Sequence, residues 1–194
     1  MEVSKSLIAL ASLAVIGAVV APALAGTKVQ ENIVPSSATS PPGNPTLSTA
    51  GKFQMDDKGK VQVTLKGVTD GAGAPVTTSG SYASKTMPVL DGTQYVAVFR
   101  ATFTALGLGI EGAVPVELKK GNGTGKFSQA ALFSLIPAGL GRSVELNGVE
   151  IWGPLGAGNV AACTAVVTAG YSVVANDPSC RGGTKIGVAG ISIP

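Results

Sequence analysis

Histidine is absent from the chain. Histidine is the usual general base, the usual partner of a nucleophilic serine or cysteine, and a common ligand of zinc and copper. Its absence excludes a Ser-His-Asp triad, blue-copper ligation through imidazole, and zinc hydrolysis that depends on histidine ligands. The sequence therefore predicts a protein that is not an enzyme and that carries no metal or other cofactor.

Charged and aromatic residues are also scarce, at 13% and 5% of the chain, whereas charged residues make up roughly 25% of a typical soluble protein. A surface of serine, threonine and glycine with few charges favours an extracellular β-protein over a cytosolic helical one. The net charge is only +3, and the densest group of cations, Lys119, Lys120 and Lys126, is not interleaved with aromatic residues that would stack bases. We therefore expect no nucleic-acid partner.

The longest hydrophobic run lies near the start of the chain, from Leu7 to Val20. It is shorter than the roughly 20 residues that a membrane-spanning helix needs, and Pro22 interrupts its continuation. Ala23 and Ala25 then supply the small residues of an A-x-A cleavage pattern. Residues 1–25 are therefore predicted to be a secretory signal peptide that is removed before Gly26.

Export sets the expected location of the mature chain. We expect it to be secreted, either extracellular, at the cell surface or in the periplasm, with no membrane insertion after cleavage. The alternative is an uncleaved anchor, because Glu2 offsets Lys5 and leaves the first residues only weakly positive.

Only two cysteines are present, Cys163 and Cys180. In an exported chain an even number of cysteines predicts a disulfide, here between these two residues. Closing a loop of this size would stabilise the domain by about 3 kcal/mol in the chain-entropy model. A redox pair or a zinc site fits less well, because the spacing is not C-x-x-C and no histidine is available as a zinc ligand.

The mature chain divides into two parts by composition. Residues 26–51 hold Pro35, Pro41, Pro42 and Pro45 among serine, threonine and asparagine, with almost no sustained hydrophobic periodicity. They are predicted to form an extended leader, either a spacer or a disordered tail. Residues 52–194 have the length of a single domain with one hydrophobic core.

Alternation of apolar and polar residues, the period of a β-strand, recurs along residues 52–194. The longest example is 93–106, where Tyr95, Phe99 and Phe103 share one face. Roughly eight short strands, separated by glycine and proline, predict an antiparallel β-sandwich of immunoglobulin-like or jelly-roll type.

Turn residues predict how these strands are connected. Hairpins are expected at residues 56–59 and at the glycine-rich tip 121–125, and Asn147-Gly148 predicts a tight turn or a bulge within 144–152. The valine- and alanine-rich segment 160–174 and the last strand, 184–193, would form a terminal hairpin tied by the two cysteines.

Two sequence patterns resemble those of functional sites, and each also has a purely structural interpretation. Residues 107–112 match G-x-G-x-x-G, but the continuation resembles a strand rather than a helix and lacks the acidic residue expected about twenty positions on. These glycines predict a flexible loop between strands. A histidine-free glycosidase would use a pair of carboxylates, and solvated strand positions explain the candidates equally well; these are Glu111, Glu117, Glu145 and Glu150.

Three further residues are candidates for modification or ligand binding. Asn122 begins an N-x-[ST] sequon on a predicted exposed tip, where a glycan would fit. Trp152, beside Gly153, is the first candidate for stacking a ligand ring, with Tyr171 as the second. For Trp152 a place at the edge of the core is the alternative.

These observations favour an exported, non-enzymatic structural or interaction component of the cell surface, envelope or extracellular space, whose partners are itself or other surface proteins. In a self-assembling version, residues 28–34 or 185–193 would add a strand to a neighbour. One alternative is a carbohydrate- or other ligand-binding module, which would also use Tyr82 or Tyr95. The other is a histidine-free, carboxylate-dependent glycoside hydrolase.

Overall fold

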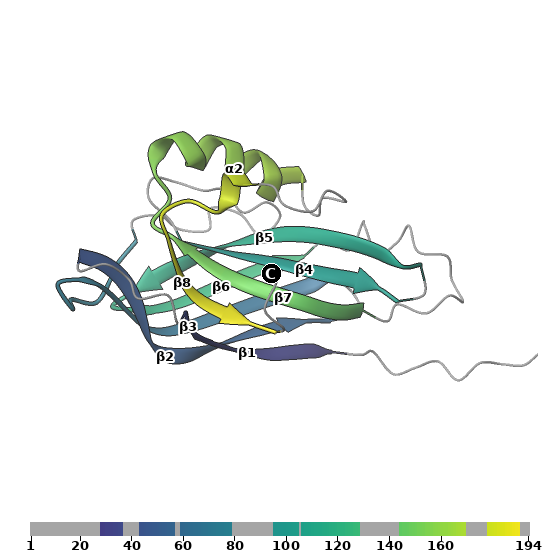
Figure 1. Cartoon of the computed structure of the whole chain (residues 1–194), viewed down its shortest axis with the longest axis horizontal. Coiled ribbons are helices and arrows are strands. Elements are labelled where there is room, and N and C mark those ends of the chain that lie inside the picture. The colour runs from purple at the N-terminus through teal and green to yellow at the C-terminus, as the bar shows by residue number, and fades with distance from the viewer. Residues whose placement is uncertain are drawn as a thin grey trace, which may run out of the picture.

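The computed structural model describes residues 28–36, 43–56, 59–78, 95–104, 106–128, 144–169 and 178–190. Within these ranges the chain is mostly β-structure with one α-helix and one short 3-10 helix (Figure 1). The elements are β1 (Val29–Pro35), β2 (Gly43–Met55), β3 (Lys60–Gly71), β4 (Tyr95–Phe103), β5 (Leu108–Lys119), β6 (Asn122–Ser128), β7 (Val144–Gly153), α2 (Ala157–Ala169), η1 (Pro178–Cys180) and β8 (Thr184–Ala189).

The described strands form one closed antiparallel barrel in the order β1-β2-β3-β6-β5-β4-β7-β8. The barrel closes where Val34 of β1 pairs with Val188 of β8. The prediction of an antiparallel all-β fold is confirmed, and the predicted two-sheet sandwich is corrected to a barrel. The alternating pattern determines which face of a strand is buried, but the same pattern suits both architectures. Pairing between the first and last strands decides between them.

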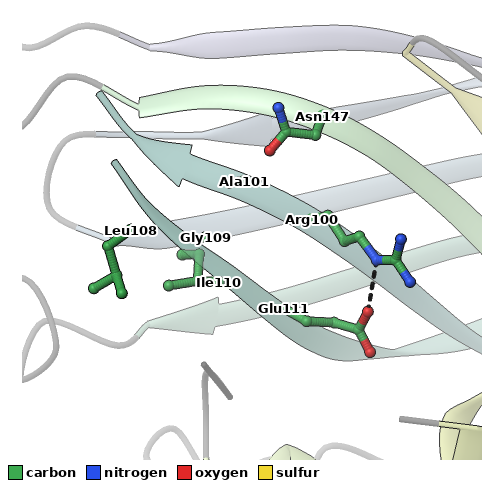
Figure 2. A pocket seen from close by; sticks show the side chains of 7 residues that line it. All are labelled: Arg100, Ala101, Leu108, Gly109, Ile110, Glu111 and Asn147. Carbon is green, nitrogen blue, oxygen red and sulfur yellow. Dashed lines mark hydrogen bonds and ion pairs between the residues drawn. The ribbon is translucent and has the colours of Figure 1, made fainter. Parts of the chain in front are cut away.

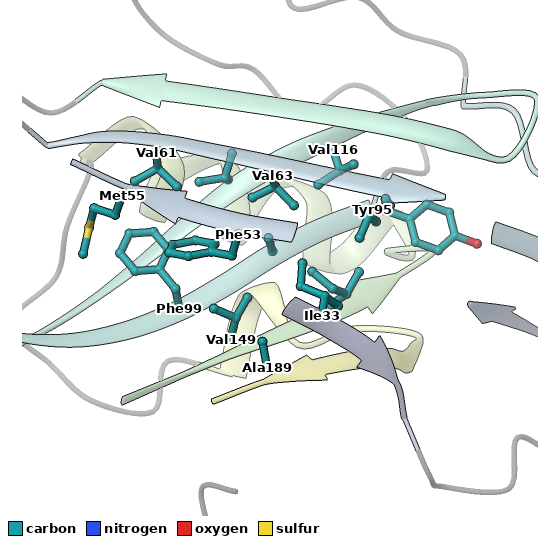
Figure 3. Close-up of a cluster of buried hydrophobic side chains, with 14 of the residues drawn as sticks. Ile33, Phe53, Met55, Val61, Val63, Tyr95, Phe99, Val116, Val149 and Ala189 are labelled. Atoms are coloured by element: carbon teal, nitrogen blue, oxygen red, sulfur yellow. The ribbon is translucent and has the colours of Figure 1, made fainter. Parts of the chain in front are cut away.

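Inward-facing side chains fill the barrel (Figure 3). A barrel of about eight strands has an interior just wide enough for side chains to fill it. Phe53 of β2 and Phe99 of β4 are fully buried there, with ring centroids 5.2 Å apart. Tyr95 and Phe103 lie on the same buried face of β4 as Phe99, as the alternation predicts.

The range 26–51 contributes to the barrel, contrary to the predicted leader. It contains β1 and the first part of β2, and Ile33 of β1 is fully buried in the core. The prolines in these strands lie where a missing N–H is tolerated. Pro35 is the last residue of β1, and Pro45 lies at a shift in the register between β2 and β3. The composition of residues 26–51 predicted an irregular segment. The pairing of β1 with β2 and β8 instead makes β1 part of the barrel.

The predicted hairpin at 56–59 is confirmed, and Asn147-Gly148, predicted as a tight turn or a bulge, forms a bulge. A hairpin also joins β5 to β6, but the predicted tip 121–125 is corrected, because residues from Asn122 onward already belong to β6. β2 and β3 are joined through the turn that follows Met55, and β5 and β6 through a turn at Lys120 and Gly121. In β7, Gly148 lies opposite Arg100 of β4 while Leu146 lies opposite Ala101, so Asn147 is the extra residue of a bulge.

The glycine-rich segment 107–112 is the start of a strand and not a loop. Gly107 alone of these residues is in the turn, with a φ of 61°. From Leu108 onward the segment pairs in continuous register with β4, up to Gly112 opposite Phe99. Because β5 runs on to Lys119, no helix follows the motif, as a dinucleotide site would require.

The segment 160–174 was predicted as a strand, but its described part belongs to the helix α2. Alanine and valine occur on all sides of α2, so the sequence shows neither the period of a strand nor that of an amphipathic helix. Cys163 of α2 forms the predicted disulfide with Cys180 of η1. The disulfide therefore joins a helix to a 3-10 turn instead of tying a terminal hairpin.

The helix and the disulfide cover the outer face of β4. Val96 and Val98, which alternate with the core residues of β4, are buried against Leu155 and the two cysteines. Figure 1 shows α2 lying along this side of the barrel, near β4 and β5. β4 is thus buried on both faces over its first half.

Several predictions fall on residues that the structure does not describe. These are the signal peptide at 1–25 with its cleavage site and the aromatic candidates Tyr82 and Tyr171. Among the residues that are described, none of the helices has the length and hydrophobicity needed to cross a membrane.

Phe99→Ala should lower the free energy of unfolding by about 3–5 kcal/mol, because it removes a fully buried ring and leaves a cavity facing Phe53. Chemical denaturation followed by circular dichroism measures the loss. Lys66→Gln on the exposed side of β3 is the control and should change stability by less than about 0.5 kcal/mol. Equal effects for the two substitutions would contradict the core described above.

Candidate functional site

Charged side chains from four neighbouring strands converge on the outer face of the barrel, beside the segment that follows η1. β5, β4, β7 and β8 are consecutive in the barrel, and each contributes at least one residue. Arg181, directly after Cys180, reaches over them. We call this group the glutamate–arginine cluster; it consists of Arg100 (β4), Glu111 (β5), Glu150 and Trp152 (β7), Arg181, and Lys185 (β8).

Glu111 is the most buried charge in the cluster, with 3% of its surface exposed. It lies opposite Arg100 in the β4–β5 register, and Nε of Arg100 donates to Oε2 of Glu111 at 2.8 Å. Arg181 binds the same carboxylate with both terminal nitrogens, Nη1 to Oε1 at 3.0 Å and Nη2 to Oε2 at 2.9 Å. Such two-point binding of a carboxylate is among the strongest side-chain hydrogen bonding in proteins.

Glu150 receives three side-chain donors. Arg181 donates through Nε to Oε2 at 2.9 Å, Trp152 through Nε1 to Oε2 at 3.1 Å, and Lys185 through Nζ to Oε1 at 3.3 Å. Burial of Glu150 opposes ionisation, but hydrogen bonds from Arg181, Trp152 and Lys185 outweigh it and lower the pKa of the carboxyl. For Arg181 burial acts to lower the pKa, while its bonds to Glu111 and Glu150 raise it overall. Both partners are therefore held in their charged forms.

Trp152 is half-buried and belongs to this cluster instead of forming an open ligand platform. Its ring packs against the apolar residues beneath α2. Nζ of Lys185 lies 5.6 Å from the ring centroid, within cation–π distance. With its N–H bonded to Glu150 and a cation near its ring, Trp152 serves as a wall of the cluster.

A hollow of about 240 Å³ lies next to the cluster (Figure 2). Arg100, Glu111 and Asn147 line its polar side. Asn147 is placed there by the β7 bulge and accepts a hydrogen bond from Oγ1 of Thr102 at 2.8 Å. The space exists partly because Gly109 has no side chain, and a Cβ atom there would meet nothing within 4 Å.

The geometry argues against acid–base catalysis by these glutamates. A retaining or inverting glycosidase needs one carboxyl with a raised pKa to protonate the leaving group. Glu150 has the opposite shift, and both oxygens of Glu111 are bound to arginine. Because of these contacts, the two carboxylates bind the C-terminal segment to the barrel wall.

The other predicted site residues lie apart from the cluster or are inaccessible. Glu117 pairs with the exposed Lys119 at 3.2 Å, and Glu145 is exposed on β7. Asn122 is exposed at the start of β6, immediately after the hairpin turn, where a glycan has room. Tyr95 points into the barrel and is only 2% exposed, so it is unavailable for ligand stacking. Within the described ranges no three Cys, Asp or Glu side chains group as metal ligands would.

Sequence reasoning did not identify Arg100, Arg181 or Lys185 as members of a site. Neither an arginine after a cysteine nor a lysine in a strand is itself a signal. Their relation to Glu111 and Glu150 depends on β5, β4, β7 and β8 being neighbours, which is a property of the barrel's strand order.

Comparison of the chain with protein-family models, with curated proteins and with solved structures finds no match.

Arg181→Met should lower the free energy of unfolding by about 3 kcal/mol near neutral pH, because it leaves the buried Glu111 and the partly buried Glu150 with fewer partners. Denaturant titration measures the loss. Lys119→Met breaks a pair whose lysine side chain is 78% exposed, and should cost less than about 1 kcal/mol. Similar losses in both variants would show that the cluster contributes no more than a surface ion pair.

Tyr95→Phe should remove part of the loss of stability in alkali. Burial, with a smaller contribution from the charge of Asp70, raises the pKa of Tyr95 to about 12 from its ordinary 10.0. The folded state therefore keeps the phenol proton after the unfolded state has lost it, and the stability declines as the pH rises from 10 towards 12. At about pH 11 the wild type should have lost about 1 kcal/mol more than Tyr95→Phe, relative to about pH 9. Parallel curves for the two proteins in denaturation experiments at each pH would contradict this assignment.

Proposed function

We propose that the chain is an exported, non-enzymatic β-barrel that acts as a structural or interaction component at a cell surface, in an envelope or in the extracellular space. The observation that carries the proposal is the engagement of the buried Glu111 and the partly buried Glu150 in ion pairs with Arg181. Charges held in this way stabilise a fold and are poorly suited to catalysis. The disulfide between Cys163 and Cys180 supports an oxidising compartment.

The N-terminal pattern supports export. The apolar run Leu7 to Val20 followed by Ala23 and Ala25 has the order and length of a signal peptide. Removal before Gly26 would leave only a short segment ahead of β1, which begins at Val29. Cleavage would therefore free the domain without removing any described strand.

Interaction through the outer surface is favoured over exchange of strands. Residues 28–34 contain most of β1, which pairs with β2 and β8, and residues 185–193 contain most of β8, which pairs with β7 and β1. Donation of either segment to a neighbour would break pairs that close the barrel. A barrel that is closed in this way has few free edges to offer.

The protein recovered from its native source should begin at Gly26 and carry an oxidised Cys163–Cys180 pair. Intact mass spectrometry before and after reduction, combined with cell fractionation, measures both properties. A chain that begins at Met1 in the membrane fraction would contradict cleavage and favour the uncleaved anchor, and one with free thiols in the cytosol would overturn export.

The non-enzymatic part of the proposal has a separate test. The purified protein should release no sugar from a panel of glycosidic substrates, and Glu150→Gln should behave as the wild type does. Turnover that is abolished by Glu150→Gln or Glu145→Gln, in variants that still fold, would favour the hydrolase alternative.

A further inference from the structure

Four lysines lie on the neighbouring strands β2, β3 and β6. Figure 1 shows β2 and β3 on the side of the barrel away from α2. Their inward neighbours, such as Phe53, Val61 and Leu65, are buried in the core, so strand alternation points the lysines outward. We call them the lysine face; they are Lys52 on β2, Lys60 and Lys66 on β3, and Lys126 on β6.

The strand register fixes how the four are arranged. Lys52 lies beside Thr64, and Lys126 lies beside Gln62, on opposite sides of β3. Lys60 is the first residue of β3 and Lys66 lies near its middle, six residues apart, or roughly 20 Å at about 3.3 Å per residue. The lysine face is therefore an elongated patch three strands wide.

The charge of this patch is not neutralised within the described part of the chain. None of the four lysines has an ion-pair partner there. The nearby described carboxylates lie at its margins and form no ion pair with these lysines. Asp56 accepts the backbone N–H of Lys60, Asp70 accepts those of Ala72 and Ala74, and Glu117 pairs with Lys119.

Neutral hydrogen-bonding groups fill the space between the cations. One row across the strands reads Gln30, Gln54, Gln62 and Lys126, and Nε2 of Gln54 donates to Oε1 of Gln30 at 2.8 Å. The next row reads Asn32, Lys52, Thr64 and Thr124. The patch thus offers amides and hydroxyls beside fixed positive charge.

We propose that the lysine face binds an acidic polysaccharide, with its carboxylate or sulfate groups on the lysines and its hydroxyls on the amides and threonines. The proposal rests on the proposed function, in that a surface component of an exported protein would meet such a polymer. Charge complementarity selects an anionic partner. The polar rows favour a sugar chain, which has a hydroxyl on most of its carbons.

Other anionic partners fit this surface less well. The described outward-facing side chains of β1, β2, β3 and β6 include no aromatic ring, whereas single-stranded nucleic acids are held by stacking on aromatic residues. The patch is three strands wide on the wall of a closed barrel, whereas the groove of a duplex admits a helix or a two-stranded ribbon. Val34 is the large apolar residue exposed near these rows, so the patch has little to insert into a lipid bilayer.

Direct binding to polygalacturonate and to dextran sulfate tests the proposal, with uncharged dextran as the reference polymer. Isothermal titration calorimetry at low ionic strength should show binding to both acidic polymers that weakens as salt is added. Lys52→Gln/Lys126→Gln should weaken binding by about fivefold, consistent with the loss of two surface ion pairs. Lys119→Gln/Lys120→Gln removes the same net charge from the β5–β6 turn and should change binding by less than about twofold.

Several results would overturn the inference. They are absence of binding to both acidic polymers, equal binding to dextran, equal losses in the two double variants, and tighter binding to duplex DNA or to anionic phospholipid vesicles than to either polysaccharide. If Lys52→Gln/Lys126→Gln melts below the wild type, the single variant Lys126→Gln, on the exposed side of β6, replaces it. Because binding is measured with the purified protein, a result that contradicts export would not affect this test. Likewise, an absence of binding would not contradict the export proposal.

Discussion

The packed interior of the closed barrel is the constraint on which the rest of the structure depends. Every strand must send alternate side chains inward, and the fully buried pair Phe53 and Phe99 shows how tightly the space is used. The positions in between are then free to carry other chemistry. Apart from Arg181, the glutamate–arginine cluster and the lysine face are both built from side chains at outward-facing strand positions.

The outward positions differ between the two sides of the barrel. On β4, Val96 and Val98 are covered by α2, and the disulfide and the bonds of Arg181 to Glu111 and Glu150 hold that cover at the barrel wall. On β2, β3 and β6 the same positions are open, polar and cationic. On the side covered by α2 the charged side chains pair with one another, whereas on β2, β3 and β6 the lysines face solvent. The two glutamates are therefore engaged within the fold, whereas the lysine face is exposed to solvent, where the proposed anionic partner would bind.

Predictions from the sequence were most reliable for features that depend on residues close together in the chain. It predicted the strand containing Tyr95 and Phe99, the existence of both hairpins and an irregularity at Asn147-Gly148, because alternation and turn residues act over a few positions. It was wrong about α2, because alanine and valine on all sides leave no period to read. It was also wrong to separate residues 26–51 as a leader, because a short, largely polar strand with a proline at its end, such as β1, is recognisable only once its partners are known.

The sequence by itself determined the all-β class, the pairing of Cys163 with Cys180, and the exclusion of every chemistry that needs histidine, because each follows from composition or from short-range patterns. Closure into a barrel, the glutamate–arginine cluster and the lysine face were decided by tertiary structure alone. Each depends on which strands are neighbours, and strand order follows from packing of the whole chain. Lys52 and Lys126, scattered in the sequence, flank one strand because β3 lies between β2 and β6.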